Sequence, residues 1–78
     1  HLANGQIETL QFQIKEANKM TAKPLSQLKL KKGVLIAAII RKGKTIFPTG
    51  EDILEVGDKL LVTTLLPNIT KIYDLIER

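Results

Sequence analysis

The chain has 78 residues, a formal net charge of +4 and no cysteine. A chain of this length forms one domain and buries only about 60 to 65% of the surface that its unfolded form exposes, so its core is marginal and would gain from self-association. The lack of cysteine excludes disulfides, thiolate zinc sites and thiol catalysis. The longest apolar run has seven residues, whereas a helix needs roughly 20 to span a bilayer.

Charge is distributed unevenly along the chain. Lys15 to Lys44 holds nine basic residues and one acid, a balance of +8, and the remaining residues carry −4. Such a basic stretch could attract nucleic acid, an anionic membrane or a phosphorylated ligand. The alternative is that its lysines form a solvated surface, as charged runs usually do. The few aromatic residues do not interleave with the lysines, so the pattern is not typical of a nucleic-acid binder.

The N-terminal third predicts a polar lead-in, a strand and a short helix. Residues 1–6, HLANGQ, resemble the remnant of a linker, and the domain itself is expected over residues 7–78. Ile7 to Lys15 alternates apolar and polar residues, which is typical of a half-exposed strand. Pro24 is suited to the first turn of a short helix, in which Leu25 and Leu28 would share a face.

The middle of the chain predicts a fully buried strand followed by a hairpin. Val34 to Ile40 is apolar at every position, so both faces of this strand need a cover. Lys42-Gly43 has the composition of a two-residue hairpin loop, and Thr45 to Phe47 would form the short return strand. After a turn-rich stretch, Lys59 to Leu65 reads as another strand.

The C-terminal residues predict an amphipathic helix that begins at Pro67-Asn68. Its apolar stripe would consist of Ile69, Ile72 and Ile76. The expected fold is therefore α+β: a small β-α-β-β-β-α domain with a mainly antiparallel sheet. One amphipathic helix and one short helix cannot cover both faces of the apolar strand. We therefore expect a second copy of the chain to cover the other face, in a homodimer with Leu35, Ala37 and Ile39 at the interface.

The residue types argue against an enzyme. The only histidine is His1 and the only serine is Ser26, so the components of a nucleophilic triad are absent, and we predict no catalytic residue. The four central acids do not have the spacing of a calcium loop, and we interpret them as turn and strand-entry residues. They are Glu51, Asp52, Glu55 and Asp58. No metal site and no cofactor site are predicted in this domain.

The chain resembles the C-terminal domain of Trk-type potassium-uptake regulators, the TrkA-C or RCK-C domain family. The resemblance rests on AKPLSQLKL, where the family has Gly-Lys-x-Leu-x-x-Leu, and on GVLIAAIIRKGKTIFPTGEDILEVGDKLLV. The second segment matches an apolar strand, Arg-x-Gly, a Pro-x-Gly turn and Leu-x-x-Gly-Asp. Ala22 replaces the glycine that is usual in the first motif.

This resemblance implies a non-enzymatic regulatory domain of a potassium-uptake system. Such a domain follows a nucleotide-binding Rossmann domain and lies in the cytoplasm. The full-length protein is held at the inner face of the membrane because it binds a potassium-transporting subunit there. The same domain is also appended to other ion transporters and channels, including antiporters and chloride channels. From another class, a small module that binds nucleic acid or an acidic partner remains the alternative. Its electrostatic patch would consist of Lys29, Lys31, Lys32, Arg41, Lys42 and Lys44.

The resemblance further implies a ligand site at the dimer cleft. Some family members bind cyclic di-AMP there, and the matching positions in this chain are Leu35, Ile36 and Arg41. An adenine can rest on aliphatic side chains, and a guanidinium can bind phosphate through paired hydrogen bonds. The asparagine that helps to hold the ligand in such members has no counterpart in residues 42–47. In the other interpretation, the two aliphatic residues are interface core and the arginine is a hairpin charge.

Overall fold

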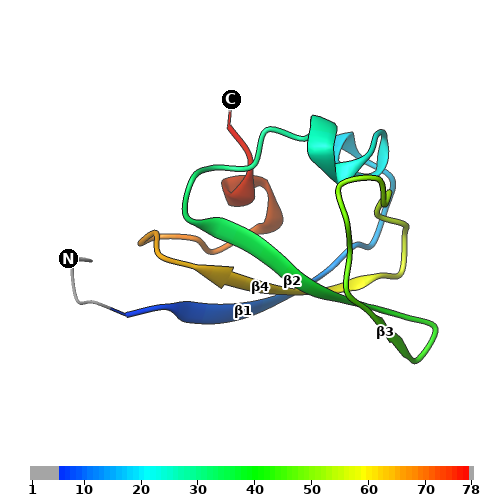
Figure 1. Ribbon diagram of the computed structural model, residues 1–78, viewed down its shortest axis with the longest axis horizontal. Helices are drawn as coiled ribbons and strands as arrows, with labels where there is room; N and C mark the ends of the chain where they lie inside the picture. Colours follow the sequence, from blue (N-terminus) through cyan, green and yellow to red (C-terminus); the bar gives the residue numbers. More distant parts are fainter. Residues whose placement is uncertain (1–5, 78) are drawn as a thin grey trace.

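A four-stranded antiparallel sheet organises the domain (Figure 1), for which the computed structural model describes residues 6–77. The strands lie side by side in the order β1-β4-β2-β3, so β1 and β3 are the two edges of the sheet. Their bounds are Glu8–Gln13 for β1, Val34–Arg41 for β2, Lys44–Ile46 for β3 and Lys59–Thr64 for β4. The predicted half-exposed first strand is confirmed, and its edge position explains why one of its faces is polar.

Within residues 6–77 the remaining regular structure consists of three short 3-10 turns, and it lies on one side of the sheet. These turns are η1 (Lys19–Thr21), η2 (Leu25–Gln27) and η3 (Ile72–Leu75). Figure 1 shows them, with their connecting loops, above the strands, while no element of the described chain covers the opposite side. Pro24 precedes η2 as expected, although the helix that it introduces is a single 3-10 turn. The core therefore lies between the sheet and this one layer of turns.

The strand register separates an inner face from an outer face. Leu10, Val62 and Ile36 pair directly across three strands, and so do Phe12, Leu60 and Ile39 in the next inner row. Directly paired residues lie on the same side of a sheet, so these apolar rows all face the turns. Together with residues of the turns and loops they form the core. Its buried members are Ile14, Met20, Leu28, Ile36, Ile39, Leu54, Leu60, Val62, Ile69 and Leu75.

A β-bulge at Ala37 interrupts the regular alternation of β2. The register shifts between Ile36, which pairs with Val62, and Ala38, which pairs with Leu61. Because one extra residue reverses the alternation, Ile39 points inward and is completely buried. The three residues that we predicted at a dimer interface, Leu35, Ala37 and Ile39, therefore do not share one face, because Ile39 belongs to the core of the single chain. Only a strand without a bulge would have carried it outward.

The β2–β3 hairpin has the predicted loop. Arg41 pairs with Lys44, which leaves Lys42 and Gly43 as the two loop residues. Both have positive φ, 51° for Lys42 and 78° for Gly43. This is the backbone of a type I′ turn, whose twist matches that of the flanking strands. Gly43 adopts it without steric cost because it has no Cβ.

The predicted C-terminal amphipathic helix is wrong, because only the four-residue turn η3 forms there. The carboxylate of Asp74 accepts hydrogen bonds from the backbone N–H groups of Thr70 and Lys71 and closes a tight turn. The chain then becomes extended at Ile76, which forms an isolated antiparallel bridge with Leu30. The β-branched residues before the turn also have low helix propensity. The apolar residues of the predicted stripe are nevertheless packed against the core.

Replacing Ile39 by alanine tests which face of β2 belongs to the core. We expect Ile39→Ala to lower the free energy of unfolding by about 2 to 5 kcal/mol, since it leaves a cavity in the closed interior. Ile53→Ala is the matched control, because the Ile53 side chain lies on a loop and is 45% exposed. It should cost less than about 1 kcal/mol. Urea unfolding gives both values, and equal losses would contradict the inward orientation of Ile39.

Candidate functional site

The end of β2 carries a buried ion pair between Arg41 and Asp58. Arg41 Nε donates to Asp58 Oδ1 and Arg41 Nη2 donates to Asp58 Oδ2, both at 2.9 Å. This bidentate geometry is the strong form of an arginine–carboxylate pair. The Asp58 side chain is only 1% exposed, whereas the Arg41 side chain is 23% exposed. The aspartate therefore lies inside the domain, and the guanidinium closes it off from solvent.

The same arginine holds the loop that precedes β4. Its Nη2 also donates to the carbonyl oxygen of Ile53 at 3.0 Å, and its Nη1 lies 3.1 Å from Glu55 Oε2. Asp58 in turn accepts the backbone N–H of Glu55 at 2.8 Å. The backbone N–H of Ile14 donates to the Asp58 carbonyl oxygen at 2.9 Å. One cluster thus joins the end of β2, residues 53–58 and the residue that follows β1.

The environment of Asp58 stabilises its charged form. Burial by itself raises the pKa of this carboxyl group, but three effects outweigh it. They are the hydrogen bond from Arg41, the hydrogen bond from the backbone N–H of Glu55 and the nearby positive charge of Arg41, which together bring the pKa below its ordinary value of 3.8. In the same way, the hydrogen bond to Asp58 raises the pKa of Arg41. Both groups are therefore charged throughout the neutral range.

The structure does not bring Leu35, Ile36 and Arg41 together within one chain. Leu35 lies on the outer face of the sheet and is 61% exposed, whereas Ile36 points into the core and is 5% exposed. A guanidinium has five N–H donors, and the contacts to Asp58, Ile53 and Glu55 occupy four of those of Arg41. Arg41 is thus a structural residue in the single chain. Cyclic di-AMP binding at a dimer cleft stays a prediction.

Sequence reasoning missed the role of Asp58. The interpretation of the central acids as turn residues holds for Asp52, since its carboxylate accepts the backbone N–H of Thr49. It does not describe Asp58, whose carboxylate is buried and paired with Arg41. The Leu-x-x-Gly-Asp motif, which ends at Asp58, sets this acid apart from the other three, but it does not name Arg41, 17 residues away, as the partner. Across residues 6–77 no three histidine, cysteine or acidic side chains are grouped so that they could hold a metal ion.

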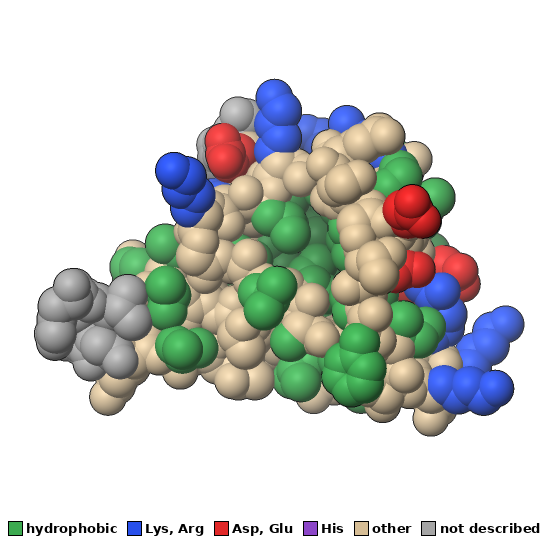
Figure 2. All heavy atoms as spheres, viewed as in Figure 1, with side chains coloured by type: hydrophobic (Ala, Val, Ile, Leu, Met, Phe, Trp, Pro, Cys, Tyr) green, Lys and Arg blue, Asp and Glu red, His purple; other side chains and the backbone are tan. Residues whose placement is uncertain are grey.

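The outer face of the sheet is the second candidate site, and it is apolar at its centre. Leu35, Ile40 and Leu61 are 61%, 37% and 37% exposed there. Three outward rows make up this face: Thr9–Thr63–Leu35, Gln11–Leu61–Ala38 and Gln13–Lys59–Ile40–Thr45. Lys59 is the one charged residue in these rows. Figure 2 shows hydrophobic side chains in the middle and lower part of the view, with lysines at the top and at the lower right.

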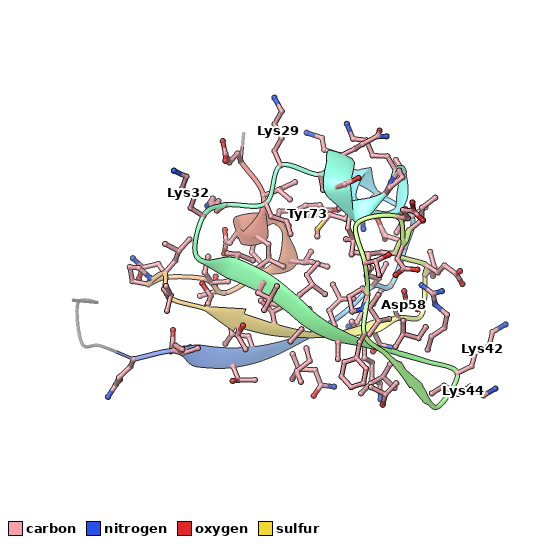
Figure 3. All side chains as sticks on the ribbon, in the orientation of Figure 1. Lys29, Lys32, Lys42, Lys44, Asp58 and Tyr73 are labelled. Carbon is pink, nitrogen blue, oxygen red and sulfur yellow. The ribbon has the colours of Figure 1, made fainter. Side chains whose placement is uncertain are left out.

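The basic residues of the predicted electrostatic patch do not form one surface. Figure 3 shows Lys29 and Lys32 near the turns, whereas Lys42 and Lys44 project from the hairpin at the other end of the domain. Arg41 is occupied by its acidic partners. The prediction of a single electrostatic patch that uses all six basic residues is therefore wrong.

No helix within residues 6–77 is long and apolar enough to cross a membrane.

A comparison with protein families matches residues 10–77 to the TrkA-C domain. The chain belongs to the TrkA-C domain family. This TrkA-C domain is 31% identical over 58 residues to the Trk system potassium uptake protein TrkA homolog 1 of Methanosarcina mazei, covering 74% of this chain and 13% of that protein. It is 26% identical over 74 residues to the Trk system potassium uptake protein TrkA of Azorhizobium caulinodans, covering 95% of this chain and 16% of that protein. The chain therefore spans only a small part of the curated relatives it matches.

Removing the guanidinium should destabilise this TrkA-C domain strongly. We expect Arg41→Ala to lower the free energy of unfolding by about 3 to 5 kcal/mol, because it leaves the buried carboxylate of Asp58 without its partner. Lys44→Ala, on the exposed β3 strand of the same hairpin, should change stability by less than about 0.5 kcal/mol. Chemical denaturation of both variants measures the difference. A loss below about 1 kcal/mol for Arg41→Ala would show that the pair contributes little.

The lowered pKa of Asp58 predicts acid sensitivity. The unfolded chain binds a proton at this carboxyl group more readily than the folded chain does, so the contribution of Asp58 is complete well above pH 4. It is lost as the pH falls below about 4, through the folded-state pKa. Asp58→Asn should therefore be less stable than the parent at neutral pH, with a gap that narrows in acid. Because Asp74 also has a lowered pKa and remains in both proteins, the comparison isolates Asp58. A gap that stays constant down to pH 2 would contradict it.

Proposed function

We propose that this TrkA-C domain is a non-catalytic regulatory domain of a potassium-uptake system, and that it acts by pairing with a second copy through the outer face of its sheet. The observation that carries the proposal is this open face, whose three outward rows hold an apolar centre and one charged residue, Lys59. Its family and the potassium-uptake names of its relatives support the regulatory role.

The composition of the outer face suits a protein–protein interface. The buried centre of such interfaces is depleted of charge and rich in aliphatic or aromatic side chains, with polar residues at the rim. Here Leu61 is central, Leu35 and Ile40 lie in the neighbouring rows on β2, and the threonine and glutamine side chains of β1 lie at the edge of the sheet. A chain of 78 residues has little core of its own, so the covering of this face would add substantially to its stability.

A two-fold axis through the middle row would make the face self-complementary. In a symmetric dimer each residue contacts the partner residue that lies opposite the axis. With the axis near Leu61, the two leucines would pack against each other. Lys59 of one copy would then lie over the row that contains Thr63 and Leu35 in the other copy. Such an arrangement keeps the two Lys59 charges apart and places the most exposed leucine within the covered area.

The whole protein would place this dimer beside a transporter. In the proposed arrangement a nucleotide-binding Rossmann domain precedes the TrkA-C domain, and a membrane potassium-transport subunit binds the full-length protein from the cytoplasm. The names of the relatives support potassium over other ions. The sequence that precedes residue 1 in the parent protein tests this arrangement. A Gly-x-Gly-x-x-Gly strand-turn-helix there would support it, whereas membrane helices would indicate a domain appended to another transporter.

A charge placed at the centre of the outer face tests the dimer. We expect the parent domain to sediment as a dimer at micromolar concentrations and Leu61→Glu to sediment as a monomer, since the substitution would bury two like charges side by side. Ile53→Glu is the control on an exposed loop outside this face and should remain dimeric. A parent domain that stays monomeric across the concentration series would overturn the proposed pairing. In the full-length protein, Leu61→Glu should alter potassium uptake without loss of expression.

A further inference from the structure

No lysine forms a salt bridge with an acid within residues 6–77. Every salt bridge between residues that the structure describes involves Arg41. The lysines are nevertheless not scattered evenly, because five of them line two adjoining hollows beside the C-terminal segment. These are Lys19, Lys23, Lys29, Lys31 and Lys71. We call the two hollows together the basic groove.

The two hollows are continuous and large enough for a ligand. Their volumes are about 750 and 440 Å³, and Lys19, Ile76 and Glu77 line both of them. Lys71 and Lys31 lie along the first hollow, and Lys23 and Lys29 along the second. Binding sites for small ligands commonly measure about 300 to 1,000 Å³. Lysines therefore line both hollows of the basic groove.

The backbone around the basic groove is held in place. The N–H of Lys31 donates to the carbonyl oxygen of Leu75 at 2.9 Å, and the N–H of Glu77 donates to that of Lys29 at 2.7 Å. Between these bonds Leu30 forms its bridge with Ile76, and both side chains pack against the core. In an extended segment the neighbours of an inward residue point outward, so Lys29 and Lys31 face away from the core. Figure 3 shows Lys29 projecting away from the sheet.

The lining between the lysines is partly apolar. Tyr73 is 49% exposed and lines the first hollow together with Ile76. Two acids also contribute, but Asp74 is already engaged by the N–H groups of Thr70 and Lys71 and by the Thr70 hydroxyl. That leaves Glu77 as the acid without such internal hydrogen bonds among the lining residues. Among the described lining residues there are five lysines and two acids, so the basic groove is positive.

We propose that the basic groove binds an extended acidic segment of a partner protein. Carboxylates spaced along such a segment can meet the lysines in turn, while its uncharged side chains contact Tyr73 and Ile76. A lipid bilayer is too flat to follow a concave surface to these two residues. A nucleic-acid strand carries a phosphate at every step and would meet Glu77, whereas a peptide can place an uncharged residue there. The basic groove is built from the turn side of the sheet, away from the outer face, so dimer formation and partner binding are independent.

Paired charge reversals distinguish binding in the basic groove from attraction by the net charge of the domain alone. The probe is a dye-labelled peptide of Glu-Glu-Leu repeats, with the Gln-Gln-Leu peptide as its uncharged counterpart, and fluorescence anisotropy measures binding. We expect the domain to bind the acidic peptide and not the uncharged one. Lys19→Glu combined with Lys29→Glu should weaken binding by at least about tenfold, because it turns attraction into repulsion in both hollows. Lys42→Glu combined with Lys44→Glu changes net charge equally at the distant hairpin and should weaken binding by less than about threefold.

The outcomes decide between specific and general attraction. Equal losses in the two double variants, or no binding of the acidic peptide at 0.15 M salt, would overturn the proposal. Tighter binding of a single-stranded oligonucleotide or of phosphatidylserine vesicles through the same lysines would also overturn it, in favour of a phosphate-bearing partner. Lys19 and Lys29 are exposed, so their variants should keep the parent thermal unfolding, and Lys19→Ala with Lys29→Ala gives a milder second test. Tyr73→Ala should weaken binding of the acidic peptide relative to the parent domain. Sedimentation of the same samples measures their oligomeric state, so the dimer is tested separately from peptide binding.

Discussion

One additional residue in β2 determines much of this domain. The bulge at Ala37 reverses the alternation of the strand. Ile36 points inward before the bulge, and Ile39 and Arg41 point inward after it, whereas a regular strand would turn these two residues outward. Without it, Arg41 would project from the outer face, and Asp58 would be buried without a counter-charge. A buried carboxylate in that state costs several kcal/mol. The bulge, the ion pair and the position of the loop before β4 are thus mutually dependent features.

The same bulge sets the character of the outer face. It moves the charged end of β2 away from that side and leaves Leu35, Ala38 and Ile40 in the outward rows. Because the turns lie only on the inner side (Figure 1), the outer rows remain open in the single chain. A sheet face with an apolar centre and a polar rim resembles a protein interface more than a solvated surface. The buried ion pair on the inner side and the scarcity of charged residues on the outer face therefore both result from the bulge.

The position of Arg41 affects how any ligand at this end of the domain would be recognised. Its guanidinium holds Asp58, Glu55 and the Ile53 carbonyl oxygen, which leaves one N–H donor for anything else. A phosphate that took two donors would have to displace the exposed Glu55 first. Loss of ligand binding in an Arg41 variant would therefore report a loosened loop as well as a lost contact. The basic groove does not have this ambiguity, because its lysines form no salt bridges with described residues.

Local chemistry in the sequence determined the strands of the sheet and the hairpin. Alternation in Ile7 to Lys15, the apolar run of Val34 to Ile40 and the Lys42-Gly43 loop each depend on neighbouring residues, and the corresponding strands and turn all form. The family resemblance was likewise carried by residues close together in the sequence and is confirmed. The predicted C-terminal helix does not form, because the hydrogen bonds of the Asp74 carboxylate and the bridge between Ile76 and Leu30 take the place of helical hydrogen bonds.

The tertiary structure decided the rest. Which side of β2 is buried depends on a bulge, and an unbroken apolar run contains no signal for where an extra residue will lie. The partnership of Arg41 with Asp58 and the assembly of distant lysines into the basic groove join residues far apart in the chain. The spacing of apolar residues in a sequence indicates whether a single segment forms a strand or a helix. Contacts between elements depend on how the strands pair and where the loops return, so only the folded chain determines them.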